Sequence, residues 1–170
     1  MVATRMDCRL AARIDPSDIV QETFTQAWQK LPVYLEERPV PFYVWLRDIA
    51  WQRLQHHHEQ HIGAQKRTVN REQDPPWSLS DQSHALLAGQ FAASQTSPSR
   101  HVSAGEQRDR VRAALDQLAP HHREVIILRH LEQLSFEEMA ATLSITQEST
   151  YSRYRRAVVR LHELLSDSSG

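Results

Sequence analysis

Apolar residues near the start of the chain recur every three to four positions, the spacing at which side chains share one face of a helix. The first such group is Ile19, Val20, Phe24, Ala27 and Trp28. Asp15 and Pro16 precede it, and this pair is typical of a helix start because aspartate caps free backbone N–H groups and proline suits the first turn. We therefore predict an amphipathic helix from about Pro16 to Lys30. Its polar face is formed by Asp18, Gln21, Glu22 and Gln26.

Three prolines, Pro32, Pro39 and Pro41, interrupt this pattern before a second helical periodicity begins. The second helix is predicted from Phe42 to about His58. Its apolar positions are Phe42, Trp45, Leu46, Ile49, Ala50 and Leu54, and its basic ones include Arg47, Arg53 and His56 to His58. Aromatic and basic side chains together suit a single nucleic-acid strand, because rings stack on bases and cations pair with phosphates. Burial in a core is the simpler interpretation of the aromatic residues, and both interpretations stay open.

The last third of the chain shows four helical segments with short connections. Residues 106–118 and 120–131 each carry an apolar face. The third segment opens on Ser135 and Glu138, which form a capping box in which each side chain satisfies a backbone N–H group at the helix start. A turn at residues 144–146 separates this short helix from a long fourth one. A short capped helix, a tight turn and a long helix form the pattern of a helix-turn-helix.

The fourth helix of this module directs an apolar stripe inward and a polar face outward. The outward residues are Gln147, Glu148, Ser149, Tyr151, Ser152, Arg155 and Arg156, with Arg153 and Arg160 at the margin. Glutamine, serine and arginine can hydrogen-bond base edges in the major groove, while arginines at the rim neutralise phosphates. Such a face is often only solvated, but the capped helix and turn before it favour recognition of duplex DNA. Ser144 opens the turn where glycine is common, so we expect backbone strain there.

Between these blocks, residues 66–105 are rich in serine, glutamine and proline and contain only short apolar pieces. We interpret the segment as a polar linker, because so few apolar residues cannot bury a core. The predicted fold is all-α, with two small helical domains at residues 1–65 and 106–170, the second a four-helix helix-turn-helix domain. Only 4 of the 170 residues are glycine, which favours helices over hairpins with glycine turns.

Composition narrows the classes of function. The net charge of −1 excludes a polycation that coats nucleic acid, so DNA contacts must come from local patches. One cysteine allows no internal disulfide, and no apolar stretch suits a signal peptide or a membrane span, so we expect a cytoplasmic protein without membrane insertion. No nucleophile triad or phosphate-binding glycine loop is visible, so we expect neither enzymatic activity nor a cofactor. His57 and His61 could share a metal at helical spacing, but they lack the Glu-x-x-His pattern of zinc enzymes, and no metal is expected.

Two separate stretches resemble one family, the bacterial sigma-70 factors, and in particular its small extracytoplasmic-function group. The residues from Asp15 to Trp28, Asp-Pro-Ser-Asp-Ile-Val-Gln-Glu-Thr-Phe-Thr-Gln-Ala-Trp, resemble the polymerase-binding helix of region two. Residues 42–50 resemble the promoter-melting helix of that region. Residues 118–129 and 134–145 resemble region four. The resemblance covers most of the chain outside the expected linker.

The resemblance implies partners and contact residues. Polymerase contacts on the clamp helices of the β′ subunit would come from Asp18, Gln21, Glu22 and Thr23. The −10 DNA contacts would come from Phe42, Trp45, Arg47 and Arg53, and the −35 contacts from Gln147, Glu148, Ser149, Tyr151, Ser152, Arg153, Arg155 and Arg156. Residues 33–41 would form the loop that captures a flipped base of the −10 element. The implied partners are core RNA polymerase, including its β flap, and promoter DNA, with an anti-sigma factor as a further candidate.

Three features depart from the family pattern. Members usually have a longer helical segment before the equivalent of Asp15 than residues 1–14 provide. Tyr151 stands where a lysine is common, so base preference is not transferred, and the expected linker is longer and more polar than in many members. The alternative to a sigma factor is a stand-alone helix-turn-helix regulator, which would bind operator DNA as a dimer without polymerase. The stretch that begins at Asp15 argues against that alternative, because such a regulator does not need it.

Overall fold

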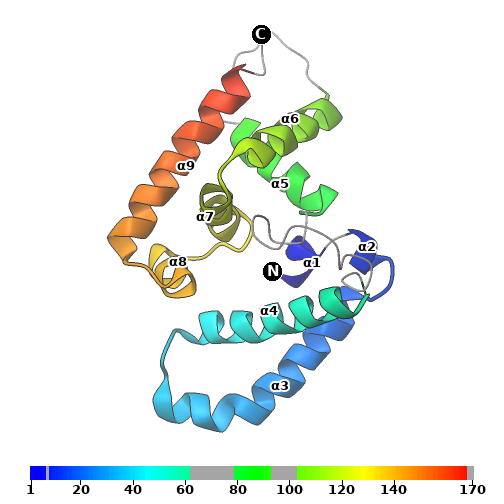
Figure 1. Ribbon diagram of the computed structural model, residues 1–170, viewed down its shortest axis with the longest axis vertical. Helices are drawn as coiled ribbons and strands as arrows, with labels where there is room; N and C mark the ends of the chain where they lie inside the picture. Colours follow the sequence, from blue (N-terminus) through cyan, green and yellow to red (C-terminus); the bar gives the residue numbers. More distant parts are fainter. Residues whose placement is uncertain (7, 62–78, 93–102, 168–170) are drawn as a thin grey trace. The chain divides into compact units, whose positions relative to one another are not determined.

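The computed structural model describes residues 1–6, 8–61, 79–92 and 103–167. They fall into two compact units, Met1–Ser80 and Asp81–Gly170, which we treat separately. Every regular element in the described ranges is an α-helix (Figure 1). The predicted all-α class is confirmed.

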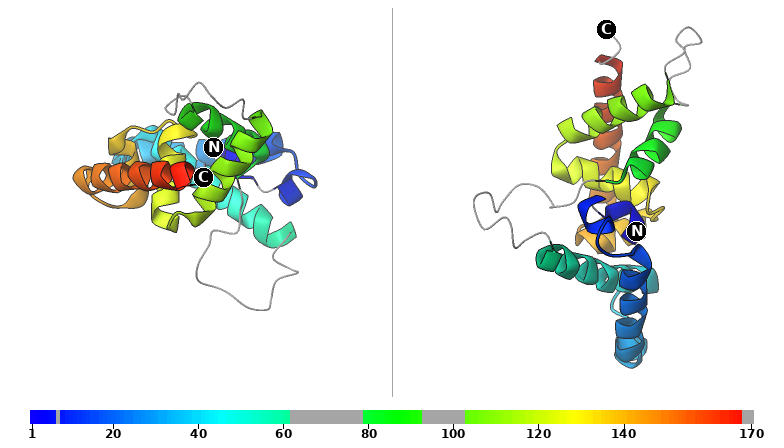
Figure 2. Two further views of the ribbon diagram at one scale, coloured as in Figure 1. Left: turned by 90° about the horizontal axis from the view of Figure 1, so that it is seen from above. Right: turned by 90° about the vertical axis from the view of Figure 1, so that its right-hand side faces the viewer.

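The first unit is built on two long helices that run in opposite directions, α3 (Pro16–Glu37) and α4 (Phe42–His61) (Figures 1 and 2). Two short helices precede them, α1 (Val2–Arg5) and α2 (Cys8–Ala11). The core joins residues from all parts of the unit: Val2, Met6, Leu10, Ile19, Ala50 and Leu54. Val2, Met6 and Leu10 therefore bring core side chains from before α3 to the α3–α4 hairpin.

The helix α3 begins as predicted and ends later than predicted. Asp15 caps it, accepting a hydrogen bond at 2.8 Å on Oδ1 from the backbone N–H of Ser17. The expected end at Lys30 is wrong, because the helix continues through Pro32 to Glu37. A proline inside a helix costs about 3 kcal/mol. The packing of the last turn offsets this cost.

Tyr34 anchors that last turn of α3. Its ring is buried and stacks on Trp45 of α4 with centroids 4.5 Å apart, and its hydroxyl donates to the Val40 carbonyl at 3.0 Å. The backbone then leaves the helix at Arg38, in the left-handed region with φ 41°, where its N–H donates to the Tyr34 carbonyl. The expected base-capturing loop at residues 33–41 is therefore mostly helical, and only residues 38–41 connect α3 to α4.

The second unit contains the four predicted helices and one more. The four are α6 (Ala104–Gln117), α7 (Pro120–His130), α8 (Phe136–Leu143) and α9 (Gln147–Asp167), and α9 packs against the other three. The additional helix, α5 (Asp81–Ala92), lies inside the expected linker and packs against α6. The unit therefore starts earlier than residue 106, and the interpretation of residues 66–105 as a polar tether is wrong for α5.

The few apolar residues of α5 complete an existing core instead of forming their own. Leu87, Ala88 and Phe91 are all buried. The Phe91 ring lies beside His130 of α7, with centroids 4.8 Å apart, and Gln90 also contacts His130. Counting apolar residues within the segment could not reveal this, because their partners come from elsewhere in the sequence.

The helix-turn-helix has the local geometry that the sequence predicted. Both capping-box bonds at the start of α8 are present, from the Ser135 N–H to Glu138 Oε2 at 2.8 Å and from the Glu138 N–H to Ser135 Oγ at 3.1 Å. Ser144 ends α8 in the left-handed region, with φ 53°, which costs a residue other than glycine about 1 kcal/mol. Thr146 Oγ1 then accepts from the Ser149 N–H at 3.1 Å and caps α9.

Candidate protein and DNA interfaces

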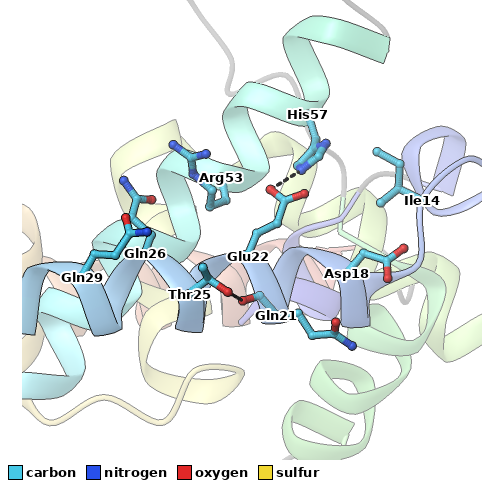
Figure 3. Close-up of a pocket in the computed structure, with 9 residues that line it drawn as sticks. All are labelled: Ile14, Asp18, Gln21, Glu22, Thr25, Gln26, Gln29, Arg53 and His57. Carbon is cyan, nitrogen blue, oxygen red and sulfur yellow. Dashed lines mark hydrogen bonds and ion pairs between the residues drawn. The ribbon is translucent and has the colours of Figure 1, made fainter.

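A polar groove runs along α3 and α4 in the first unit (Figure 3). Its lining residues are Ile14, Asp18, Gln21, Glu22, Thr25, Gln26, Gln29, Arg53 and His57. Glu22 Oε2 lies 2.9 Å from His57 Nε2, so a hydrogen bond links the two helices across the groove. Three of the four residues expected to bind polymerase, Asp18, Gln21 and Glu22, therefore share one exposed surface.

The fourth expected polymerase contact, Thr23, lies on the opposite side of α3. Its side chain is buried, and its hydroxyl donates to the Ile19 carbonyl at 2.7 Å. Ile19 and Ala27, four residues away on each side, are also buried. The prediction of Thr23 as a surface contact is wrong, because the small residues on this stripe pack within the unit.

The apolar residues predicted for one face of α3 divide between two stripes, because Ile19 and Ala27 are buried with Thr23 on one of them. Val20, Phe24 and Trp28 are 36%, 59% and 78% exposed, so their side chains project from the surface. Both stripes repeat every four residues, and hydrophobicity alone favours the stripe with the larger side chains. The missed signal is size, because the small Thr23 and Ala27 suit a face that approaches neighbouring helices closely. The surface of α3 thus presents an apolar row of Val20, Phe24 and Trp28, which we call the α3 apolar row.

The four residues expected to contact the −10 element lie in different environments. Phe42 is half exposed at the start of α4, with its ring against Tyr34, and Trp45 is partly buried in the Tyr34 stack. Arg47 is buried, and its guanidinium lies over the Trp51 ring, 5.6 Å from the centroid. Arg53 is partly buried and lines the groove. The structure therefore does not bring the four together, and Arg47 as a surface contact is wrong because it packs on an aromatic ring.

The outward face of α9 agrees with the sequence prediction. The exposed residues are Gln147, Glu148, Ser149, Tyr151, Arg155 and Arg156, while Ser152 and Arg153 are partly exposed. Thr150, Ala157 and Leu161 are buried on the inner face. Tyr151 is 54% exposed and leans edge-on against Phe136 of α8. The eight residues expected to contact the −35 element are thus all accessible on one helix.

A second groove lies beside this face, between the start of α7 and the first half of α9. His121, His122, Glu148, Ser149, Ser152, Arg153 and Arg156 line it, and we call it the α7–α9 groove. The two histidine rings lie 4.3 Å apart between centroids. Burial lowers the pKa of His122 below its usual value, and His121, Arg156 and Arg153 nearby lower it further. The two histidines were absent from the sequence-based set because they come from another helix.

A hydrogen-bonded network under α9 keeps the module together. His130 Nδ1 lies 2.7 Å from Gln90 Oε1, and His130 Nε2 lies 3.0 Å from the Tyr154 hydroxyl. Burial lowers the pKa of His130, with Arg129 adding to the effect, and burial raises the pKa of Tyr154. A neutral ring with its proton on Nδ1 satisfies both contacts, since it donates to Gln90 and accepts from Tyr154. One imidazole therefore joins α5, α7 and α9.

The structure defines an all-α protein in which a helical hairpin unit accompanies a helix-turn-helix unit. Residues 2–61 match the family described as Sigma-70 region 2, and residues 108–161 match the one described as Sigma-70, region 4. RNA polymerase sigma factor CnrH of Cupriavidus metallidurans is 30% identical over 155 residues, covering 91% of this chain and 75% of CnrH. The RNA polymerase sigma-E factor of Streptomyces antibioticus is 46% identical over 52 residues, covering 31% of this chain and 29% of that protein.

Two solved structures are also similar. CnrH in complex with the cytosolic domain of CnrY gives a TM-score of 0.49 at 23% identity, covering 90% of this chain and 72% of that one. The sigma factor RpoE in complex with the anti-sigma factor NepR from Bartonella quintana gives a TM-score of 0.47 at 23% identity, covering 89% of this chain and 81% of that one. The chain belongs to the sigma-70 family, in its extracytoplasmic-function subfamily. It is a sigma factor of RNA polymerase, a protein of transcription initiation.

Within the described residues, no helix combines the length and apolar character needed to cross a bilayer. In the same ranges, no three histidine, cysteine, aspartate or glutamate side chains are placed to hold a metal ion. His57 and His61, the pair considered as metal ligands, have stacked rings 6.1 Å apart, and His57 Nε2 contacts Glu22.

Proposed function

We propose that this sigma factor docks on core RNA polymerase through the outer surface of α3, with Asp18, Gln21 and Glu22 facing the clamp helices of the β′ subunit. The observation that carries the proposal is the α3 apolar row, which projects three large side chains beside this polar surface. Exposed aromatic rings next to polar residues are typical of protein-binding surfaces. We include Phe24 and Trp28 in the docking surface and leave Thr23 out of it.

For the −10 element, we propose that the connection at residues 38–41 and the first turn of α4 receive the unpaired non-template strand. Phe42 is half exposed at this place and offers a ring face on which a base can stack. A flipped base can be recognised by its exposed edges. Trp45 and Arg47 support this surface from below, through the Tyr34 stack and the Trp51 ring. Arg53 lines the polar groove between α3 and α4 instead.

For the −35 element, we propose that α9 enters the major groove of duplex DNA with its N-terminal half. The accessible Gln147, Ser149 and Ser152 can hydrogen-bond base edges, while Arg153, Arg155 and Arg156 can bind bases or phosphates. The membership in the sigma-70 family favours this role over that of a stand-alone regulator. The β flap and an anti-sigma factor remain proposed partners on the same family grounds.

Run-off transcription with purified core polymerase tests the proposal. We expect specific transcripts from a promoter library only when the full chain is added. The variants Phe24→Ala and Trp28→Ala should weaken polymerase binding by at least about tenfold, because buried aromatic anchors dominate protein interfaces. Leu86→Ala is the control, since Leu86 is an apolar residue in the other unit that is about as exposed as Phe24. Tight binding to one duplex without any initiation would instead identify a stand-alone regulator.

A further inference from the structure

The α7–α9 groove brings a cluster of cationic and titratable side chains next to the proposed DNA-reading face. Arg153 and Arg156 come from α9, and His121 and His122 come from the first turn of α7. Glu148 is the one carboxylate among the lining residues. Two arginines against one glutamate make the groove positive before either histidine binds a proton, and an anion is the ligand that this charge suits.

The groups that could neutralise this charge are engaged elsewhere or absent from the lining. On α8, which also packs against α7, Glu138 accepts from the Ser135 N–H, and neither it nor Glu137 lines the groove. Within the described ranges, no ion pair with a carboxylate involves Arg153 or Arg156. Ala119 precedes α7 and provides no side-chain cap, so this helix start still favours negative charge.

We propose that the α7–α9 groove binds one backbone phosphate of duplex DNA, with His122 as a proton-dependent ligand beside His121, Arg153 and Arg156. This inference rests on the proposed −35 role of α9 and adds the histidines of α7 to it. A phosphate suits the groove better than a base edge, because arginines and imidazoles from two helices line the same groove at the margin of the reading face. The consequence is a promoter affinity that increases as the pH falls.

The direction of the pH effect follows from the surroundings of His122. In the free protein, burial and the cations around it, Arg153 and Arg156, keep the pKa of His122 low. A bound phosphate adds a negative charge and stabilises the imidazolium, so the pKa rises on binding. By linkage, DNA then binds more tightly to the protein when the solution supplies the proton. The protonated ring also neutralises one more phosphate charge, which increases the salt dependence of binding.

The test uses the full chain and a labelled duplex of random sequence, with affinity measured by fluorescence anisotropy at about pH 6 and about pH 8 over a range of salt. We expect wild-type affinity to be several-fold higher at the lower pH, because the imidazole is protonated to a greater extent in the complex than in the free protein. The double variant His121→Gln/His122→Gln should lose this difference and keep the affinity seen at the higher pH. His56→Gln, which removes an exposed histidine in the other unit, should behave like wild type.

A second readout separates ligand binding from a structural role. Proton-detected titration of the His122 imidazole by nuclear magnetic resonance should give a higher pKa with DNA than without it. Identical titration in both states would overturn the proposal, and so would an unchanged pH dependence in the double variant or no duplex binding at either pH. Run-off transcription by the double variant at about pH 8 is expected to persist. Its persistence alongside a failed pH test would leave the proposed sigma function standing without this phosphate site.

Discussion

Glu22 Oε2 and His57 Nε2 lie 2.9 Å apart and join the two long helices of the first unit (Figure 3). The same carboxylate lies on the surface proposed to dock polymerase. Its side chain is 44% exposed, whereas that of His57 is 13% exposed. Glu22 therefore has two roles to reconcile, since it positions α4 against α3 and is also accessible to a partner.

A double-mutant cycle of Glu22→Gln and His57→Gln should give a small coupling energy. We expect about 0.5 kcal/mol, because a partly exposed polar pair gains little over the same groups when they are hydrated. Urea denaturation of the full chain measures it. A coupling above about 2 kcal/mol would show that the pair is a main support of the hairpin. Polymerase binding by His57→Gln should stay near wild type, because this change leaves the Glu22 carboxylate in place.

Replacement of Phe91 tests whether α5 belongs to the second unit. Phe91→Ala removes a buried ring that contacts His130, so it should lower the free energy of unfolding of that unit by about 3 kcal/mol. Leu86→Ala, in the same helix but exposed, is the matched control and should change it by less than about 0.5 kcal/mol. Calorimetry on the full chain resolves the effect. Equal stability of the two variants would mean that α5 does not pack in solution.

The His130 network should make the second unit less stable in acid. The folded-state pKa of His130 is lowered, so the unfolded chain binds a proton more readily. Neutral His130 therefore stabilises the folded unit fully above the pKa of the unfolded state, about 6.5. This stabilisation is lost as the pH falls through the lower pKa of the folded state. The melting temperature of the second unit should decrease as the pH is lowered from about 8 to about 5.

Two variants distinguish His130 from His122, whose pKa is also lowered. His130→Gln should start less stable, because it disturbs the contacts with Gln90 and Tyr154, and should show a weaker loss in acid. His122→Gln should retain the part of the acid effect that belongs to His130. If His122→Gln alone removed the whole effect, the destabilisation would come from the α7–α9 groove instead of from the network.

The helix-turn-helix was predictable because its determinants are close together in the sequence. The capping box pairs Ser135 with Glu138, three residues apart, and Thr146 caps α9 through Ser149, also three residues away. A long polar and basic face then follows at helical spacing. Each of these features depends on hydrogen bonds between nearby residues or on the helical spacing of polar and apolar side chains. Residues close together in the sequence are therefore enough to specify them.

The placement of α5 and the end of α3 depended on residues that are distant in sequence. Phe91 is buried against His130, and Tyr34 is held by Trp45, which outweighs the helix-breaking tendency of Pro32. Local propensities amount to a few kcal/mol at most, and a packed aromatic ring contributes as much. Whether a weak segment becomes helical is therefore decided by what it packs against.

The local pattern of α3 specified a helix with a cap, but it left open which of two apolar stripes would be buried. Both repeat every four residues, and only the packing of Thr23 and Ala27 within the unit put Phe24 and Trp28 on the surface. Tertiary packing also creates the α7–α9 groove, because its histidines and arginines lie some thirty positions apart in the sequence. Hydrogen bonds and periodicity act between neighbours along the chain, whereas burial and converging charge act between neighbours in space.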